Sequence, residues 1–564
     1  MKNEKILLAL LPFWSPLIPP LGIACLKRFL QGYGYDVKTV DANTENRFVD
    51  LGRNYFNALK EYVPGNKRGN FMNIANDVLQ NHLTAHLNYA EEREYIELVK
   101  VLVYQTFFTP VDDRQVSRLN RIVESFYNAL SCYFLRLLEE EKPSVLGLSV
   151  YSGTLPASLF AFRLAKQKYP GIKTLMGGGI FAESLAPGSP NLEFFLEQTP
   201  YIDSLIIGEG EILFLKLLRG QLPEKQRVYD LNDIQGEILE PASAGVPDFS
   251  DLDVRFYPNL SSYASRSCPF QCGFCSEALQ WGRFRKKGSK QIAAELIQLY
   301  RQHGSQLFLM GDSLLNPVIT GVAEEFIESG TAIYWDGYLR ADKAACDTRN
   351  TLRWRRGGFY RARLGVESGS PKVLQLMGKK ITVQQIKDAV YSLAYAGIKT
   401  TTCWVIGYPG ETEEDFQQTL SLVEELKGDI YEADCNPFTY YLTGQTNSEK
   451  WAGEHKPMLL YPESAKDMLM VQTWVMNCEP QREEIYRRLS RFTALCKRLG
   501  IPNPYTLNEI YRADERWQKL HKNAVPSLIE FNNGNNYIDE CKYVKELVFV
   551  PNELETEKDE DFGF

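Results

Sequence analysis

The sequence predicts an α/β protein built from a doubly wound sheet, a partial parallel barrel and a mainly helical C-terminal domain. The chain has 564 residues, more than one hydrophobic core usually holds. Short apolar runs typical of buried strands alternate with amphipathic stretches typical of helices, which indicates βα units and parallel sheets. Glycine-rich and polar phrases follow these runs, at the strand ends where parallel sheets collect their functional groups.

Residues 1–235 are expected to form the first α/β domain. Helical patterns at 20–32 and 155–169 separate its strands. The stretch 43–140 is longer than connections in such a sheet usually are, and its periodic apolar residues indicate a helical insertion. This insertion could cap an active site, dock a substrate or only pack against the sheet. The predicted strands are 6–11, 37–42, 145–150, 173–176 and 204–207.

The barrel is expected at 258–445, after a linker at 236–257. Its apolar runs recur every ~30–45 residues, the usual size of a βα unit. Residues 446–564 are predicted to be mainly helical, with an acidic tail at 553–561. The clearest barrel strands are 306–310, 332–339, 363–366 and 400–406, and the clearest C-terminal helices are 468–478 and 483–499.

The charge balance disfavours a large nucleic-acid footprint, because 63 basic and 71 acidic side chains give a net charge of −8. The basic cluster of residues 354–356, Arg361 and Arg363 is interpreted as solvated arginines near the barrel rim. Prolines at positions 12, 16, 19 and 20 interrupt the apolar N-terminus, so we expect neither a signal peptide nor a membrane span. Eleven cysteines, an odd number, favour reduced thiols and a cytoplasmic location.

Three cysteines, Cys268, Cys272 and Cys275, stand in a C-x3-C-x2-C spacing that Pro269 and Gly273 keep out of regular structure. Three soft thiolates on one loop suit a metal centre. A structural zinc site needs four ligands, and no fourth cysteine or histidine lies within 25 residues on either side. The pattern therefore favours an iron–sulfur cluster with one open iron over zinc completed by a distant residue or over unrelated core cysteines.

This motif and the strand-end phrases after it resemble the radical S-adenosylmethionine (SAM) superfamily. The resemblance implies a partial (β/α)6 barrel that holds a [4Fe–4S] cluster on Cys268, Cys272 and Cys275, with SAM chelated to the open iron. It also implies an electron donor such as flavodoxin or ferredoxin, and reductive cleavage of SAM to methionine and a 5′-deoxyadenosyl radical. Phe274 matches the position that packs against adenine. The other implied SAM contacts are Gly311, Asp312 (where many members have Glu), Ser313, Arg340, Glu367, Ser368, Gly407 and Pro409.

The first domain resembles the cobalamin-binding domain that precedes many barrels of this superfamily. Glycines after its strands would let the main chain approach that cofactor closely. The chain has no Asp-x-His-x-x-Gly motif and so offers no histidine as a lower cobalt ligand. A Rossmann-like domain kept only as a scaffold is the alternative. The implied cobalamin contacts are Ser149, Thr154, Gly177, Gly178, Gly179, Gly208 and Glu209.

The resemblance implies an enzyme that methylates an unactivated carbon of a specialised metabolite or peptide, through the radical and methylcobalamin. One alternative is a radical enzyme of this architecture that cyclises, rearranges, epimerises or oxidises its substrate. Transfer-RNA methylthiolation would need three cysteine ligands in the first domain, where only Cys25 and Cys132 occur. A non-catalytic iron–sulfur or cobalamin-binding regulator is a further alternative.

Two smaller groups of residues leave their roles open. Tyr440, Tyr441 and Cys435 lie near the last predicted barrel strand and could line the substrate pocket or pack in the core. His82 and His86, four residues apart, could share a helix face; we interpret them as exposed residues of the insertion.

Overall fold

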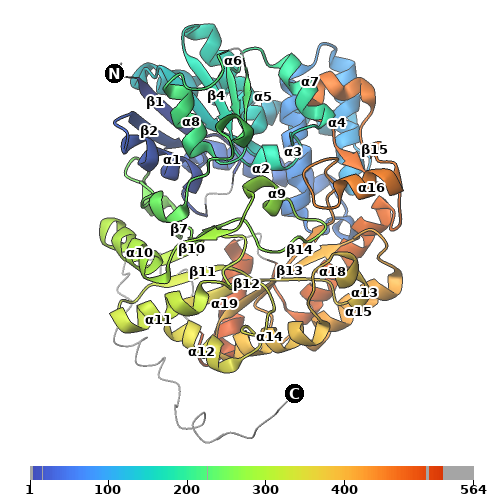
Figure 1. Ribbon diagram of the computed structural model, residues 1–564. Coiled ribbons are helices and arrows are strands. Elements are labelled where there is room, and N and C mark those ends of the chain that lie inside the picture. Colours follow the sequence, from blue (N-terminus) through green and yellow to red (C-terminus); the bar gives the residue numbers. More distant parts are fainter. Residues whose placement is uncertain (1–3, 15–16, 225, 504–506, 525–564) are drawn as a thin grey trace, which may run out of the picture.

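The structure is a computed structural model that describes residues 4–14, 17–224, 226–503 and 507–524. It contains two six-stranded parallel sheets, the N-terminal one above and the barrel below in Figure 1. This arrangement confirms the predicted α/β fold class. The predicted acidic tail, 553–561, lies outside the described residues.

The first sheet has the strand order β2-β1-β3-β4-β5-β6, with every pair parallel. Because β1 lies between β2 and β3, the strand order reverses there, which creates the switch point where doubly wound sheets bind ligands. The strands are β1 (Lys5–Leu10), β2 (Asp36–Asp41), β3 (Val145–Ser149), β4 (Lys173–Gly177), β5 (Ser204–Ile206) and β6 (Val228–Tyr229), and the helices are α1 (Leu21–Gln31), α6 (Leu155–Lys168), α7 (Pro190–Gln198) and α8 (Gly210–Leu218).

The long connection between β2 and β3 is helical, as its apolar periodicity indicates. Its helices are α2 (Asn46–Tyr62), α3 (Phe71–Asn88), α4 (Glu92–Phe107) and α5 (Asp113–Glu141), and they lie beside the first sheet in Figure 1. The interpretation of His82 as exposed is wrong. Its ring is fully buried, and its nitrogens lie 2.8 Å from the hydroxyl of Tyr55 and 2.7 Å from that of Tyr95. His86 is half-buried, and it also contacts Tyr95, so the two histidines share the inner face of α3.

The second sheet is the partial (β/α)6 barrel, with the order β14-β13-β12-β11-β10-β7 and every pair parallel. A short hairpin of β8 (Ser265–Arg266) and β9 (Arg285–Lys286) follows the first barrel strand. The strands are β7 (Leu260–Ser262), β10 (Leu307–Met310), β11 (Tyr334–Leu339), β12 (Phe359–Glu367), β13 (Lys399–Ile406) and β14 (Glu432–Pro437), and the main helices are α10 (Ser289–His303), α11 (Ile319–Ser329), α12 (Thr348–Arg356), α14 (Val383–Tyr395) and α15 (Glu413–Glu425).

The arginines of the predicted basic cluster are only partly solvated. Arg356 is exposed, but Arg355 is buried, and Arg361 and Arg363 lie on β12. Arg361 pairs with Glu432 at 2.5 Å, and Arg363 pairs with Asp336 at 2.9 Å. Residues 361 and 363 share one face of the strand because side chains alternate along it, and the ion pairs compensate their burial.

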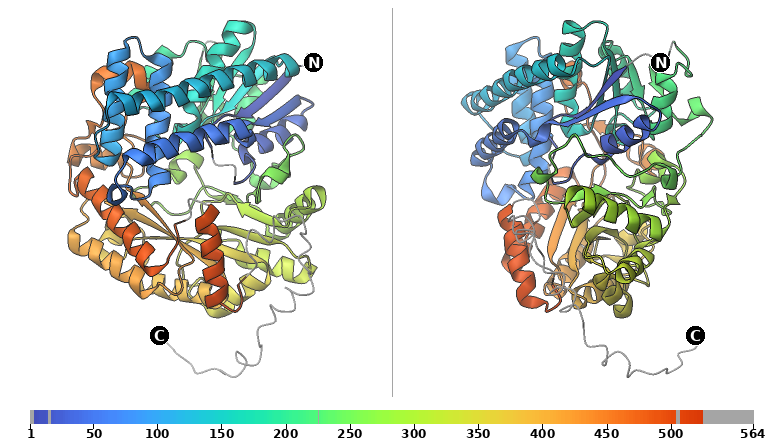
Figure 2. Two further views of the ribbon diagram at one scale, coloured as in Figure 1. Left: turned by 180° about the vertical axis from the view of Figure 1, so that it is seen from behind. Right: turned by 90° about the vertical axis from the view of Figure 1, so that its left-hand side faces the viewer.

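The C-terminal segment is helical only in part. A helix is present at α18 (Arg482–Leu499), as predicted, but the predicted helix at 468–478 is wrong. That stretch contains the end of α17 (Lys466–Leu469) and β16 (Trp474–Val475), which pairs with β15 (Met458–Leu459). Valine, threonine and tryptophan between 471 and 475 favour extended backbone over helix. The other helices are α16 (Ser448–His455) and α19 (Leu507–Leu520); Figure 2 shows α18 and α19 across the back of the barrel.

In the described part of the chain, no helix combines the length and the apolar character needed to cross a bilayer.

Candidate functional site

The cysteine motif forms a loop between β8 and the short helix α9 (Glu277–Trp281). Cys272 is buried, and Cys268 and Cys275 are half-buried. Burial raises the pKa of the Cys268 thiol, and it raises that of Cys275 to about 11; the neighbouring motif cysteines contribute to both shifts. The three sulfurs therefore lie close enough to interact electrostatically, and binding to a cation would be needed to hold them as thiolates.

Glycine 273 lets this loop pack against the rest of the barrel mouth. A Cβ atom there would stand 2.3 Å from Nδ2 of Asn447 and 2.9 Å from the hydroxyl of Tyr408. The main chain of Gly273 also donates to the carbonyl of Met377 at 2.9 Å and accepts from the amide of Asn447 at 3.0 Å. Segments far apart in the sequence thus fix the loop that carries the cysteines.

Two buried cations flank the cysteine loop. Nη1 of Arg340 lies 3.9 Å from the sulfur of Cys272, and its guanidinium carbon lies 4.0 Å from the centre of the Phe270 ring. Its Nη2 atom is buried with no hydrogen-bond partner among the described residues. Lys379 pairs with Glu367 at 2.5 Å. Positive charge beside three thiols, with a spare donor, suits an anionic cluster and a ligand carboxylate.

The donor set does not fit a single metal ion. Among the described residues, no three histidine, cysteine, aspartate or glutamate side chains are grouped closely enough to hold one ion. A zinc ion needs four ligands at ~2.0–2.3 Å, so its ligands crowd together. A four-iron cluster is larger than one ion and holds its thiolates farther apart, so three thiols on an open loop fit it.

Two residues that follow β10 differ in orientation. The carboxylate of Asp312 is engaged within the protein, whereas Ser313 lines a cavity. Asp312 accepts from the amide of Ala264 at 2.9 Å and from the hydroxyl of Ser265 at 2.5 Å. Burial raises the pKa of Asp312 to about 6. Ser313 donates to Glu277 on α9, and both line a cavity together with Gly311.

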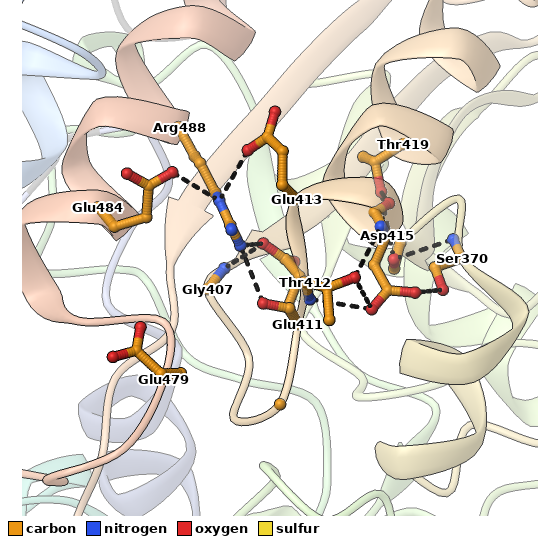
Figure 3. Close-up of polar contacts among 12 residues, drawn as sticks. Ser370, Gly407, Glu411, Thr412, Glu413, Asp415, Thr419, Glu479, Glu484 and Arg488 are labelled. Carbon is orange, nitrogen blue, oxygen red and sulfur yellow. Dashed lines mark hydrogen bonds and ion pairs between the residues drawn. The ribbon is translucent and has the colours of Figure 1, made fainter.

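The ends of β12 and β13 are fixed by buried polar contacts. Glu367 has a left-handed backbone (φ 64°), and the hydroxyl of Ser368 lies 3.2 Å from that of Thr419. The amide of Gly407 donates to Glu411 at 3.3 Å, and Glu411 pairs with Arg488 of α18 at 2.8 Å (Figure 3). The turn that carries the predicted SAM contacts Gly407 and Pro409 is therefore held by the C-terminal segment.

A cavity of about 470 Å³ lies between the two sheets. The carboxyl ends of β3, β4 and β5 line it from one side, and the β8 hairpin, α9 and the end of β10 line it from the other. Sequence reasoning missed the aromatic residues Trp14, Tyr151 and Trp281, which give no glycine or motif signal. The predicted residues on its wall are Ser149, Gly177, Gly178, Gly179, Gly208, Gly311 and Ser313.

Two predicted contacts of the first domain are engaged elsewhere. The hydroxyl of Thr154 bonds to the main chain of Tyr151, at 2.9 Å from its amide. The carboxylate of Glu209 pairs with Arg266 at 3.0 Å and also with Arg285, both on the β8–β9 hairpin. Glu209 therefore joins the two domains through its side chain, and only its main chain is left for a ligand.

A second cavity of about 310 Å³ lies beside the first, among α3, the turns after β13 and β14, and the C-terminal segment. The predicted residues Gly407 and Pro409 line it, as do Tyr440 and Tyr441. Cys435 is fully buried in the hydrophobic core and does not line this cavity.

Comparisons with known proteins agree with this architecture. Residues 262–423 match the model of the radical SAM superfamily. The anaerobic magnesium-protoporphyrin IX monomethyl ester cyclase of Rubrivivax gelatinosus is 24% identical over 319 residues, which cover 51% of this chain and 55% of the cyclase. An uncharacterized methyltransferase of Pyrococcus horikoshii is 25% identical over 318 residues, which cover 52% of this chain and 66% of the methyltransferase. The matches thus span between half and two thirds of these relatives.

A solved structure extends the likeness to nearly the whole chain. It is the radical S-adenosylmethionine methyltransferase TsrM from Kitasatospora setae with tryptophan substrate and a SAM analogue bound. The TM-score is 0.58 at 14% identity, and the alignment covers 96% of this chain and 99% of that chain. The likeness shows a shared fold, with the first sheet and the barrel in one molecule.

Proposed function

We propose that this chain, whose residues 262–423 belong to the radical SAM superfamily, is a cobalamin-dependent enzyme that methylates an unactivated carbon of a specialised metabolite or peptide. The observation that carries the proposal is the 470 Å³ cavity, where the glycine-rich strand ends of the first sheet meet the mouth of the barrel. A scaffold domain would not need such a cavity at the switch point of its sheet.

The barrel holds the [4Fe–4S] cluster and SAM that its superfamily implies, and its residues fit them. Cys268, Cys272 and Cys275 would hold the cluster, and Gly273 allows the loop to seat against the barrel. The spare Nη2 donor of Arg340 would bind a carboxylate of SAM. When bound, the cluster and SAM supply one-electron chemistry, and cobalamin supplies a transferable methyl group.

The residues that line the 470 Å³ cavity suit cobalamin. Gly177, Gly178 and Gly179 present main chain to it, and the apolar side chains of Leu175 and Phe214 also line it. Among the described residues that line it there is no histidine. Cobalamin would therefore bind here through main-chain and apolar contacts, without a histidine ligand to cobalt.

A non-methylating radical enzyme is the second candidate. The similarity to the cyclase of Rubrivivax gelatinosus favours it, because that relative is named for ring closure. The fold does not separate the two candidates, since function lies in the site and not in the fold.

The products formed from SAM test both candidates. The protein is purified anaerobically, reconstituted with iron, sulfide and hydroxocobalamin, and incubated with SAM and a strong reductant. Methylation predicts both 5′-deoxyadenosine and S-adenosylhomocysteine. Deoxyadenosine without S-adenosylhomocysteine favours the second candidate, and no cleavage of SAM contradicts an enzymatic role.

A further inference from the structure

The 310 Å³ cavity has a wall with an excess of negative charge. Asp77 of α3 and Glu183, which follows β4, face it, and the only cation among the described residues of its wall is Arg482. Arg482 already donates to the carbonyl of Gln105 and to the hydroxyl of Tyr486, the latter at 2.9 Å. Its donors are therefore largely committed within the protein.

The two carboxyl groups line the cavity, where the side chain of Asp77 is exposed and that of Glu183 is half-buried, and the charge of Asp77 acts on Glu183. Desolvation by the surrounding protein raises the pKa of Asp77 to about 6, against the charge of Arg482, which lowers it. Burial also raises the pKa of Glu183, and the charge of Asp77 raises it further. Among the described residues, the one hydrogen bond to the carboxylate of Asp77 comes from Nε2 of Gln80 and is long, at 3.4 Å. A cation placed between the two carboxylates would stabilise their ionised forms and so lower both pKa values.

Another part of the lining carries a buried amide that has no hydrogen-bond partner among the described residues. Gln472 is 6% exposed, and among the described residues neither its Nε2 nor its Oε1 has a hydrogen-bond partner. Nδ2 of Asn191 donates to the carbonyl of Gln472 at 2.9 Å, and Oδ1 of Asn191 accepts from the amide of Gln472 at 3.0 Å. These two bonds fix the main chain of Gln472. Other unpartnered polar atoms on this wall belong to Tyr440, Thr443 and Trp474.

A buried amide without hydrogen-bond partners is destabilising, so its presence on a cavity wall indicates a ligand that completes its hydrogen bonds. Nε2 donates and Oε1 accepts, and an amide of a ligand can match both at once. The rings of Tyr441, Tyr461 and Tyr486 add aromatic surface to the lining of the same cavity.

We propose that this cavity is the substrate site and takes an amino-acid amide or peptide residue, with its protonated amine between Asp77 and Glu183 and its amide on Gln472. This inference rests on the proposed function and gives it a substrate class. The position is suitable, because Glu183 lines both cavities and Gly407 and Pro409 of the predicted SAM site line this one. It also gives the helical insertion a role, since α3 supplies Asp77.

Three matched probes test the two ends separately by ligand-observed NMR on the cluster-loaded protein. L-Phenylalaninamide carries both groups, N-acetyl-L-phenylalaninamide lacks the charge, and phenethylamine lacks the amide. We expect phenylalaninamide to bind roughly tenfold more tightly than either of the others, since each end contributes a buried polar contact. Equal affinity for the three probes would overturn the proposal.

Variants assign each end to its residue. Asp77→Asn should weaken the binding of phenylalaninamide roughly tenfold and leave the binding of N-acetylphenylalaninamide unchanged. Glu183→Gln is a second variant with the same expected result. Gln472→Leu should weaken the binding of phenylalaninamide and leave the binding of phenethylamine unchanged. It should not lower the Tm, because the amide it removes has no partner. Asp50→Asn, at a surface carboxylate that pairs with Arg53, is the matched control.

The readouts separate this inference from the proposed function. Iron content and SAM cleavage report the proposed function, and probe binding reports the cavity. Selective probe binding in a protein that does not cleave SAM would keep the cavity assignment and contradict only the proposed function. Normal SAM cleavage with probe affinities that Asp77→Asn and Gln472→Leu leave unchanged would overturn the cavity assignment alone.

Discussion

Single residues around the cysteine loop show which parts of the site have a signal in the sequence. Cys268, Cys272 and Cys275 stand within eight residues and could be predicted from spacing alone. Asp77 and Gln472 come from segments 395 positions apart, and no local pattern marks either as part of a site. Their shared cavity depends on tertiary packing, which single-sequence patterns do not encode.

Replacing Gly273 with alanine tests the packing of the cysteine loop. The added Cβ would meet Asn447 and Tyr408 at distances that real Cβ atoms avoid, so the loop would have to move. We expect at least a several-fold loss of bound iron per chain, measured after anaerobic reconstitution. Gly288→Ala is the control, because nothing lies within 4 Å of its Cβ position. A Gly273→Ala variant that keeps its full iron content would contradict this role.

Asp312 should make stability depend on pH. Burial raises its pKa in the folded state to about 6, above the value near 4 in an unfolded chain. The resulting stabilisation is complete below pH 4 and is lost as the pH rises through 6. Between pH 4 and 7, the free energy of unfolding of the wild type should fall by about 2–3 kcal/mol relative to that of Asp312→Asn, whose side chain at position 312 does not titrate. Urea unfolding of both proteins at several pH values measures this, and a pH-independent difference would show that the shift is absent.

At the scale of elements, strand patterns were more informative than helix patterns. Strands β1, β3 and β10 are buried apolar runs that the sequence shows directly, whereas β13 and β14 carry many polar residues. The failure at 468–478 arose from a mixed apolar pattern whose short segments cannot be told apart by periodicity alone. The inward-facing arginines of β12 were missed because their partners, Asp336 and Glu432, lie on other strands.

The β8–β9 hairpin joins the two domains through buried ion pairs, and their removal should be costly. Glu209→Gln would remove a buried carboxylate that pairs with both Arg285 and Arg266. We expect a loss of about 3–5 kcal/mol in the free energy of unfolding. Glu240→Gln, at the exposed pair with Arg283, should cost about 0–1 kcal/mol. Equal effects of the two substitutions on denaturant unfolding would contradict a structural link between the domains through Glu209.

At the scale of the whole molecule, the fold brings the strand ends of two sheets to one region, with a cavity between the sheets and another beside it. The glycine-rich ends of the first sheet and the cysteine loop of the barrel are separate in sequence and adjacent in space. The βα alternation could be predicted from the sequence, but most side chains that line the cavities could not, because they come together only where distant segments meet.

The central claim is that one chain binds a [4Fe–4S] cluster at the cysteine loop and a corrinoid at the cavity between the sheets. Anaerobic purification with hydroxocobalamin, followed by assays of iron, sulfide and corrinoid, tests it most directly. We expect one cluster and one corrinoid per chain, with the iron lost and the corrinoid retained in Cys272→Ala. Iron that survives Cys272→Ala, or a wild-type protein without corrinoid, would contradict the account.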